Sequence, residues 1–447
     1  MRDRFLWIGC AVYAVVFTAL GTLKYDVHRN LVDFGIFTQT AASAFGCFCN
    51  SIEGTHWAFH FSPVLYFVGA ALLFAHSPIT LIALQAIAGA LVAPPIYGLL
   101  RRHGGTECAA RRMALLIWFY PPLAGLIFGD FHENGFAPAA VAWTLFTFDA
   151  GAIVWTLVAA ALALAIKEDQ AIFLAIAGML GAWRFRGTPR GRVAAAIAVA
   201  SLAIFALFFG LIQPHASAAA ATSWQPQRFY AWTRADVAAL PSMLAARFGF
   251  ALLAFAPLLF LPFTSWWMLL AAAPLGEVLL SRQSTTYTLG THYAGAWIGY
   301  VLVAFAFAVA RLEPARMQKV LSICVALCVV EFIVADPLHP GINVRHTQAR
   351  DVQLDTFANS LPPDISVATQ EEAYTHLALR DPYARLLPEE PSRPTLACFV
   401  LIDDDFPQSA RLEEYGAALR ALVAQGKYVE AMRRGNVALY RRVAACR

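Results

Sequence analysis

Charged side chains are scarce in this sequence of 447 residues. Only 14% of the residues are Asp, Glu, Lys or Arg, whereas 59% are hydrophobic and the mean hydropathy is +0.58. Soluble globular chains carry about 25% charged residues. The scarcity of charge therefore argues against a soluble protein and predicts a chain that crosses a membrane several times.

Several other features are missing as well. The net charge is only +4, and the basic residues occur in short clusters between apolar runs, so nucleic acid is not an expected partner. Gly104 and Gly105 are not followed by the GK[ST] of a phosphate-binding loop, which argues against a nucleotide-driven pump. A G-x-S-x-G elbow of a serine hydrolase is absent too. The apolar N-terminus lacks a cleavage pattern and is read as a retained first helix.

Cysteine occurs eight times, without the spacing of a metal site. Four of the eight lie in apolar runs or in a basic loop. The other four lie in segments that the topology below places in an oxidising compartment: Cys47, Cys49, Cys398 and Cys446. A disulfide between Cys398 and Cys446 is therefore possible.

Long apolar segments recur from residue 5 to about residue 335. Four clusters of Arg and Lys lie between them, and the positive-inside rule places all four in the cytoplasm. This requirement decides the role of FSPVLYFVGAALLFA (61–75), which is short for a crossing and is predicted to be a juxtamembrane or re-entrant helix. Eleven spans are predicted, near residues 5–23, 79–100, 113–129, 135–148, 151–166, 170–183, 193–213, 247–262, 264–280, 294–310 and 319–335.

Two domains follow from this pattern. Residues 1–335 form the transmembrane domain, with a first extracytoplasmic loop at 24–78, and residues 336–447 form a soluble extracytoplasmic domain. The N-terminus is expected in the cytoplasm. The predicted fold class is an all-α polytopic membrane protein of about eleven transmembrane helices with a small C-terminal α/β domain.

The C-terminal domain shows both types of secondary structure. TLACFVLI (395–402) and NVALYRRV (436–443) resemble strands, whereas residues 413–434 have helical spacing with charged faces. These patterns predict a small domain with its own core.

Unusual polar residues gather on the outer side, although Arg and Lys alone fixed the orientation. Loops between the spans bring acidic, histidine and other polar side chains to this face. They are Asp26, His28, Asp33, Gln39, Glu53, His56, His60, Asp130, His132, Glu133, Lys167, Glu168, Asp169, Arg282, His292 and Tyr293.

Each candidate also has a structural interpretation. Asp33 follows the first span, where a carboxylate is costly to bury, but it could cap the helix that follows it. His60 could be an interfacial anchor, and Lys167 with Glu168 could form a snorkelling triplet with Asp169. His292 and Tyr293 could belong to an aromatic belt.

The D-x-H-E cluster at residues 130–133 is the strongest chemical signal after Asp33. Asp130, His132 and Glu133 could bind a divalent cation, orient the imidazole, contact substrate, or simply be solvated in a short turn. The sequence leaves these alternatives open.

The segments VDFGIFTQ, HFSPVLYF, GDFHENGF, IKEDQAIF and THYAG, in this order and spacing, resemble a bacterial family of predicted membrane proteins of unknown function, numbered 2079. That family resembles the glycosyltransferase-C superfamily, and the resemblance covers nearly the whole chain. The chain departs from the family pattern at Thr38, where a second Asp is frequent, and at Glu133, where Pro is frequent.

The resemblance implies an integral membrane glycosyltransferase of the bacterial cytoplasmic (inner) membrane. It would move a sugar from a polyprenyl-phosphate donor to an unidentified extracytoplasmic acceptor, with inversion and with Asp33 as base. Ten of the other outer-face residues are expected to bind substrate: Gln39, His60, Asp130, His132, Glu133, Lys167, Glu168, Arg282, His292 and Tyr293. The lipid bilayer is the expected partner, and the cofactor is either none or a divalent cation.

Two other classes of function remain as alternatives. A transporter or flippase of a lipid-linked or anionic solute would carry charges within its spans. The predicted spans of this chain are nearly free of charged residues, and Glu277 and Glu331 are the main exceptions. A non-catalytic membrane assembly protein would use its C-terminal domain to bind a partner.

Overall fold

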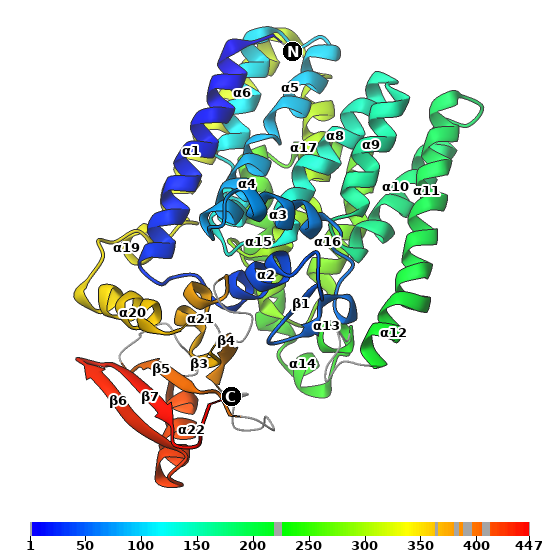
Figure 1. Cartoon of the computed structure of the whole chain (residues 1–447). Coiled ribbons are helices and arrows are strands. Elements are labelled where there is room, and N and C mark those ends of the chain that lie inside the picture. Colours follow the sequence, from blue (N-terminus) through cyan, green and yellow to red (C-terminus); the bar gives the residue numbers. More distant parts are fainter. Residues whose placement is uncertain are drawn as a thin grey trace.

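The computed structural model describes residues 2–218, 226–362, 365–379, 384–387, 396–404 and 412–446. Most of these residues form a bundle of helices, and a small domain with a β-sheet packs against the end of the bundle away from the N-terminus (Figure 1). The helices of the bundle are α1 (Arg4–Asp26), α2 (Val32–Ala42), α3 (Val64–Phe74), α4 (Ile79–Ala90), α5 (Ala93–Arg102), α6 (Glu107–Trp118), α7 (Pro121–Phe128), α8 (Ala137–Ala150), α9 (Ile153–Leu164), α10 (Glu168–Arg184), α11 (Pro189–Leu207), α12 (Gln213–Ala218), α13 (Gln227–Tyr230), α14 (Arg234–Ala238), α15 (Leu240–Phe255), α16 (Ala272–Leu280), α17 (Gly295–Val309) and α18 (Pro314–Val334).

Short helical turns connect or extend these helices. A π-helical turn, η3 (Phe208–Ile212), continues α11 into α12. The 3-10 turns are η1 (His56–Ala58), η2 (Glu133–Phe136), η4 (Ala256–Leu258), η5 (Leu261–Thr264), η6 (Trp266–Ala271), η7 (Ser284–Tyr287) and η8 (His292–Ala294).

The bundle is a polytopic membrane fold, as the composition of the chain predicts. Each predicted span contains helical residues, although α4 with α5 and α6 with α7 are broken into shorter pieces. Within the described part of the chain, six helical stretches are long and apolar enough to cross a membrane: Arg4–Asp26, Ile79–Arg102, Pro189–Ala218, Leu240–Leu258, His292–Val309 and Pro314–Val334. Three shorter apolar stretches are Val64–Phe74, Ile153–Leu164 and Trp266–Leu280.

Helix α3, which lies in the segment predicted to be a juxtamembrane or re-entrant helix, is short. Its 11 residues rise only about 16 Å, which is half of the hydrocarbon thickness of a bilayer. It packs on α2 through Gly69, where an added Cβ would lie 2.6 Å from the carbonyl oxygen of Ala41. The interpretation of segment 61–75 as a juxtamembrane or re-entrant helix stays a prediction, since Ile153–Leu164, within a predicted span, is only one residue longer.

Basic residues from distant parts of the sequence meet at one end of the bundle. Arg111 donates hydrogen bonds to both carboxylate oxygens of Asp3, at 2.9 and 3.1 Å. Arg112 reaches the backbone carbonyl of Gln318 at 3.1 Å, so the first turns of α6 and α18 lie together. Three of the four basic clusters, near residues 2–4, 101–112 and 311–319, thus lie together at this end of the bundle.

The C-terminal domain contains a five-stranded sheet in the order β4-β3-β5-β7-β6. Strands β4, β3 and β5 are parallel, and β5, β7 and β6 are antiparallel. Its elements, after the short linking helix α19 (Pro340–Asn343), are α20 (Ala349–Ser360), β3 (Val367–Thr369), α21 (Glu371–Leu377), β4 (Ala384–Leu386), β5 (Phe399–Asp403), α22 (Leu412–Ala424), β6 (Tyr428–Arg434) and β7 (Val437–Arg442).

The predicted helix at 413–434 is wrong in its second half. Helix α22 ends at Ala424, and Gly426 adopts a positive φ of 70° that L-residues disfavour. The chain then returns as β6, which pairs with β7 from Tyr428 opposite Arg442. Long-range pairing with β7 overrides the local helical spacing here. The strands predicted within 395–402 and 436–443 are confirmed by β5 and β7.

Two disulfides join the four cysteines that were expected to face an oxidising compartment. Cys398 pairs with Cys446, as the sequence allowed, and Cys47 pairs with Cys49 in the first loop. The first of these links the start of β5 to the end of the described chain. The two short strands of the first loop, β1 (Cys49–Asn50) and β2 (Gly54–Thr55), pair next to the second disulfide.

Helix α2 lies between the bundle and the C-terminal domain and contacts α21 (Figure 1). Tyr374 donates a hydrogen bond of 2.6 Å to Oε1 of Gln39. An added Cβ at Gly35 would lie 2.3 Å from the ring of Tyr374. Glycine is therefore required at this crossing, because any side chain would push the two domains apart.

Candidate functional site

A cavity of about 520 Å³ lies where segments from distant parts of the chain meet. Helix α2, the loop before α3, the start of α10, the end of α11, α13, α16 and η8 all contribute to its wall. The lining residues are Asp33, Ile36, Phe37, Glu53, His60, His132, Lys167, Glu168, Asp169, Ile172, Phe205, Phe209, Pro226, Phe229, Tyr230, Glu277, His292 and Tyr293.

The structure thus brings together seven of the eleven predicted site residues. Asp33, His60, His132, Lys167, Glu168, His292 and Tyr293 line this one cavity. Gln39, Asp130, Glu133 and Arg282 do not line it. The contacts of each of these four are described below.

Helical periodicity explains how α2 presents Asp33. Asp33, Ile36 and Phe37 are spaced at i, i+3 and i+4, so they share the face toward the cavity, whereas Gly35 and Gln39 face the C-terminal domain. Asp33 is in the first turn, but the N-cap residue is Leu31 and no side chain caps the helix. The capping interpretation of Asp33 is therefore wrong.

Asp33 has the electrostatic character of a proton acceptor. Burial and the nearby carboxylates of Asp130 and Glu53 raise the pKa of Asp33 to about 7. Its side chain keeps 42% of its exposure, because it opens into the cavity. Nδ1 of His292 lies 3.6 Å from its carboxylate, which is longer than a hydrogen bond.

Asp130 anchors the start of α2 instead of lining the cavity. Its carboxylate accepts hydrogen bonds from Lys24 at 2.8 Å, from the side chain of Asn30 at 3.0 Å and from the backbone N–H of Leu31 at 2.7 Å. Asp130 therefore provides the acceptor for the backbone N–H of Leu31, the N-cap residue of α2, whereas α2 itself has no side-chain cap. This contact holds the start of the helix that carries Asp33.

Two stacked imidazoles form one wall of the cavity. The rings of His132 and His292 lie 3.7 Å apart and are inclined by 11°. Burial, assisted by the positive charge of Lys167, lowers the pKa of His132 well below its usual value, so that this ring is neutral. Glu133 is fully buried behind it, with Oε2 at 3.0 Å from Nδ1 of His132. Nδ1 of His132 accepts a hydrogen bond from the backbone N–H of Asn134 at 3.3 Å, so this N–H, rather than Glu133, orients the imidazole. Glu133 lies next to the ring and does not line the cavity.

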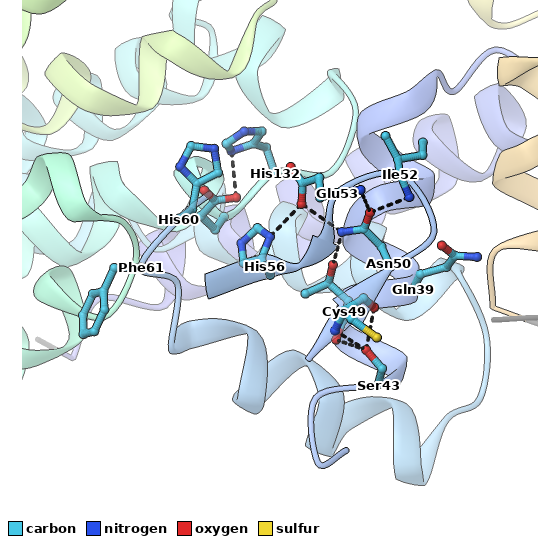
Figure 2. A network of polar contacts seen from close by, with 12 residues as sticks. Gln39, Ser43, Cys49, Asn50, Ile52, Glu53, His56, His60, Phe61 and His132 are labelled. Atoms are coloured by element: carbon cyan, nitrogen blue, oxygen red, sulfur yellow. Dashed lines mark hydrogen bonds and ion pairs between the residues drawn. The ribbon is translucent and has the colours of Figure 1, made fainter. Parts of the chain in front are cut away.

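Glu53 joins the first loop to the cavity through a network of hydrogen bonds (Figure 2). It accepts from the side chain of Asn50 at 2.8 Å and lies 3.0 Å from Nδ1 of His56. Asn50 in turn donates to Thr40 of α2 at 3.0 Å, so the loop is fixed to the helix that carries Asp33. Although Glu53 is buried, its contacts with His56 keep the pKa of its carboxyl below the ordinary value.

The IKEDQ segment supplies the charged side of the cavity. Glu168 lies 2.8 Å from Nδ1 of His60 and also accepts a hydrogen bond from the backbone N–H of Phe61, at 3.0 Å. Burial alone would lower the pKa of His60, but the carboxylate of Glu168 outweighs it and the net effect is an increase. The two residues therefore form an ion pair that ties α10 to the loop before α3.

Lys167 places a positive charge in the wall of the cavity. Its ammonium lies 4.0 Å from the carboxylate of Asp169. Burial by itself lowers the pKa of Lys167, but Asp169, Glu133 and Glu168 outweigh it, so the ammonium stays charged. A charged ammonium in a partly desolvated cavity is suited to an anionic ligand.

Gln39 and Arg282, which were predicted to bind substrate, do not line the cavity. Gln39 is 3% exposed and bonds Tyr374 and the backbone of Ala384, so it holds the C-terminal domain. Arg282 donates to Asp236 at 3.1 Å. Gln39 faces the C-terminal domain from α2, and Arg282 lies in the loop between α16 and η7, where it bonds Asp236 of α14.

The metal hypothesis for Asp130, His132 and Glu133 finds no geometric support. Asp130 is engaged by Lys24, Asn30 and Leu31, and the three residues do not form a convergent set. Over the described ranges of the chain, the one group of three His, Cys, Asp or Glu residues with ligand atoms within 4.8 Å of one another is elsewhere, at the domain boundary.

Sequence reasoning missed the aromatic part of the cavity. Phe205, Phe209, Phe229 and Tyr230 line it, and they come from the end of α11, the π-helical turn and α13. In an apolar span or a long loop, no sequence signal distinguishes such aromatics from lipid-facing or packing residues. The carboxylate of Glu277 was the visible signal in that region, since it interrupts an apolar span.

A second, almost entirely apolar groove of about 730 Å³ lies beside the first cavity. Its walls come from α3, α4, α8 and α9. Pro63 and Ile166 line it, and each is within three residues in sequence of a cavity residue, His60 and Lys167 respectively. Neighbouring residues of the chain therefore line the groove and the charged wall of the cavity.

These features define a polytopic membrane protein with a polar cavity below its C-terminal domain. The fold is similar to that of ArnT from Cupriavidus metallidurans. The structure of ArnT bound to undecaprenyl phosphate gives a TM-score of 0.57 at 13% identity, covering 99% of each chain. The apo structure of the same protein gives 0.55 at 13% identity, covering 96% of this chain and 98% of the other. The fold is thus glycosyltransferase-C-like.

The chain belongs to the family of predicted membrane proteins called DUF2079, whose model matches residues 25–439. This result confirms the resemblance found in the motifs. Among curated proteins, none matches the sequence significantly.

Proposed function

We propose that the chain is an integral membrane glycosyltransferase. It transfers a sugar from a polyprenyl-phosphate donor to an acceptor outside the cytoplasm, and Asp33 is the base. The observation that carries this proposal is the position of Asp33, with its raised pKa, in one cavity with Lys167. The full-length similarity in fold to ArnT, which binds undecaprenyl phosphate, supports the choice of donor.

Asp33 removes the proton of the acceptor hydroxyl as the sugar is transferred. A base works best when its pKa lies near the working pH, and the pKa of Asp33 is raised to about 7. The acceptor oxygen attacks the anomeric carbon, the bond to the phosphate oxygen breaks, and the proton goes to Asp33. A single displacement of this kind inverts the anomeric configuration.

Lys167 and His60 stabilise the phosphate as it leaves. Negative charge grows on its oxygens in the transition state, where a preorganised cation has its largest effect. The pKa values of Lys167 and His60 are both raised, which keeps the two side chains positive. The neutral His132 and its neighbour His292 are suited to hydrogen bonding with the sugar.

The apolar groove holds the prenyl chain. Ile166 lines it and immediately precedes Lys167, so that a lipid phosphate at Lys167 continues into a surface formed by α3, α4, α8 and α9. Its lining is almost wholly apolar, as an isoprenoid requires.

The orientation follows from the positive-inside rule. Basic residues meet at the end of the bundle away from the C-terminal domain, and this supports an orientation with the cavity and that domain outside the cytoplasm. The two disulfides agree with an oxidising compartment on that side. A bacterial inner membrane with a cytoplasmic N-terminus fits this arrangement.

The test is the consumption of polyprenyl-phosphate sugar by purified protein, with Asp33→Asn as the variant. Asp336→Asn is the matched control, because that carboxylate is exposed and lies outside the cavity. We expect Asp33→Asn to lower turnover by about 100- to 10,000-fold, with the control unchanged. Equal turnover by the two variants would refute the role of Asp33.

Lipid and glycan profiles of cells with and without the gene would identify donor and acceptor. Accumulation of a polyprenyl-phosphate sugar together with loss of one glycan supports the transferase. A transporter would instead change the sidedness of a lipid or solute without losing a glycosidic product.

A further inference from the structure

A further cavity, of about 740 Å³, is formed by the start of α1, the end of α5 and the start of α6. These elements meet at the end of the bundle away from the C-terminal domain (Figure 1). The residues that line it differ from those of the cavity that contains Asp33. Its volume lies in the range of small-molecule sites, about 300–1,000 Å³. It is therefore a separate place where a ligand could bind.

Positive charge dominates the lining of this cavity, which is called the arginine cavity below. Five arginines line it, whereas only two carboxylates do, those of Asp3 and Glu107. The arginines are Arg2, Arg4, Arg101, Arg102 and Arg111. A concave surface with an excess of one charge concentrates its potential on a bound counter-ion. The arginine cavity is thus suited to an anionic ligand.

One arginine engages both carboxylates of the wall. Arg111 donates to both oxygens of Asp3, at 2.9 and 3.1 Å, and also pairs with Glu107. Asp3 accepts a further hydrogen bond of 2.9 Å from the hydroxyl of Tyr97, and its side chain is only 6% exposed. These contacts fix the start of α1 to α5 and α6, so the shape of the cavity does not depend on a ligand.

Three of the other arginines keep most of their hydrogen-bond donors. Arg2 and Arg4 are exposed and have no ion pair within the part of the chain that the structure describes. Arg101 donates to the backbone carbonyl of Gly105 at 2.7 Å, which leaves the rest of its guanidinium group. Guanidinium groups bind phosphate oxygens through paired N–H donors. A phosphate ester is therefore the anion that this wall fits best.

The apolar part of the wall indicates that the phosphate belongs to a lipid. Phe5 and Phe146 line the cavity beside the arginines. Phe5 is also exposed on α1, and Trp7 and Ile8, which follow it, are 43% and 63% exposed. A headgroup in the cavity would leave its acyl chains next to these apolar side chains. A phosphate that is free in solution would gain nothing from them.

We propose that the arginine cavity binds the headgroup of an anionic phospholipid, with Arg2 and Arg4 on its phosphate and its acyl chains along the first turns of α1. Basic pockets between membrane-spanning helices bind such headgroups. The lipid belongs to the leaflet at the end of the bundle away from the C-terminal domain, where it ties the first helix to the turn between α5 and α6. The proposal does not depend on the reaction that the other cavity performs.

Titration of the full-length, detergent-purified protein with phosphatidylglycerol tests the proposal, with native mass spectrometry to measure the fraction that carries lipid. The variant replaces two arginines together, Arg2→Gln and Arg4→Gln. Because each basic residue near a lipid surface contributes a similar share of the affinity, we expect roughly 10- to 30-fold weaker binding. Both side chains are exposed, so the variant should melt as the parent does.

A second pair of substitutions, Arg316→Gln with Lys319→Gln, is the matched control. It removes the same amount of charge from exposed residues at the same end of the bundle, but neither residue lines the arginine cavity. The control should bind phosphatidylglycerol as the parent does. Equal losses in the two double variants would show attraction by overall charge and would overturn the site.

Glycerophosphoglycerol, the same headgroup without acyl chains, distinguishes a lipid from a phosphate in solution. At a roughly 100-fold excess it should not displace phosphatidylglycerol, because the acyl chains contribute affinity that the free headgroup lacks. Displacement at that excess would show that the cavity takes a soluble phosphate ester, and the lipid proposal would be wrong.

A photoactivatable phosphatidylglycerol locates the lipid on the parent protein without any substitution. We expect cross-links within residues 2–12 and 97–111, which unlabelled phosphatidylglycerol reduces and phosphatidylcholine does not. Cross-links confined to other parts of the chain, or equal competition by the two lipids, would contradict an anionic headgroup in the arginine cavity.

Discussion

The carboxylate of Asp33 and Nδ1 of His292 lie 3.6 Å apart, although 258 residues separate them in the chain. The stacking of His292 on His132 fixes one side of this contact, and the anchoring of α2 by Asp130 fixes the other. The space between them belongs to the cavity. An acceptor hydroxyl placed there would meet a base and an imidazole together.

Transfer activity should depend on pH through Asp33. Its pKa is raised to about 7, so the carboxylate is protonated below that pH and cannot accept a proton. We expect kcat/KM to rise with pH and to level off above about 7, with a roughly 100-fold loss at two pH units below the pKa. A profile that stays flat between pH 5 and pH 8 would contradict the role of Asp33.

Stability should depend on pH in the opposite sense. The unfolded chain releases the proton of Asp33 near its ordinary pKa, whereas the folded chain keeps it until about pH 7. Between these values the folded state binds more protons, so the contribution of Asp33 to stability falls as the pH rises.

Asp33→Asn isolates this effect. It should melt at a higher temperature than the parent at pH 8, and the difference should shrink as the pH falls and vanish below about pH 3, where Asp33 is protonated in both the folded and the unfolded state. Thermal melting in detergent at both pH values measures it. A variant that is equally destabilised at both would show that Asp33 has a structural role instead.

Removal of the lysine charge should weaken binding of the lipid phosphate. A hydrogen bond to a charged group contributes about 1.5–3 kcal/mol, so Lys167→Met should bind polyprenyl phosphate roughly 10- to 100-fold more weakly. Lys319→Met is the control, because Lys319 is exposed at the opposite end of the bundle. Isothermal titration with the phosphorylated lipid gives both affinities, and equal losses would show a nonspecific effect of charge.

The contact between α2 and the C-terminal domain should be sensitive to a single methyl group. In Gly35→Ala the added Cβ would lie 2.3 Å from the ring of Tyr374, so the domains must separate locally. Gly341→Ala is matched to it, because its added Cβ would meet nothing within 4 Å. Limited proteolysis should cleave only the first variant faster, near the start of the C-terminal domain.

Replacement of the tyrosine provides the converse test. If the clash is the cause, Tyr374→Ala in the Gly35→Ala background should restore some protection, although the hydrogen bond to Gln39 is lost. Proteolysis of the double variant at the rate of Gly35→Ala would place the cause elsewhere.

Local features of the sequence predicted much of the secondary structure. Each apolar run that was predicted as a span contains helical residues. The position of the short run at 61–75, which was kept out of the spans because of Arg101 and Arg102, stays a prediction. The strand predictions in the C-terminal domain were correct for β5 and β7. The helix prediction failed at β6, because its pairing with β7 is a long-range contact that helical spacing does not encode.

The candidate site was predicted in its location but only partly in its members. Asp33, His60, Lys167 and His292 line the cavity as expected. Asp130 is two residues before the cavity residue His132, but its carboxylate bonds the backbone at the start of α2. A loop residue can face either way, and the choice depends on packing against elements that are remote in sequence.

By itself, the sequence determined that the chain enters a membrane and which side chains gather at one of its faces. Both depend on local properties, namely the cost of placing polar groups in lipid and the positions of basic clusters. The tertiary structure alone decided that Asp33 faces a cavity while Gln39, six residues later on the same helix, faces Tyr374. It decided this because the rotation of α2 is set by Asp130 and Gly35, whose partners lie about 100 and 340 residues away.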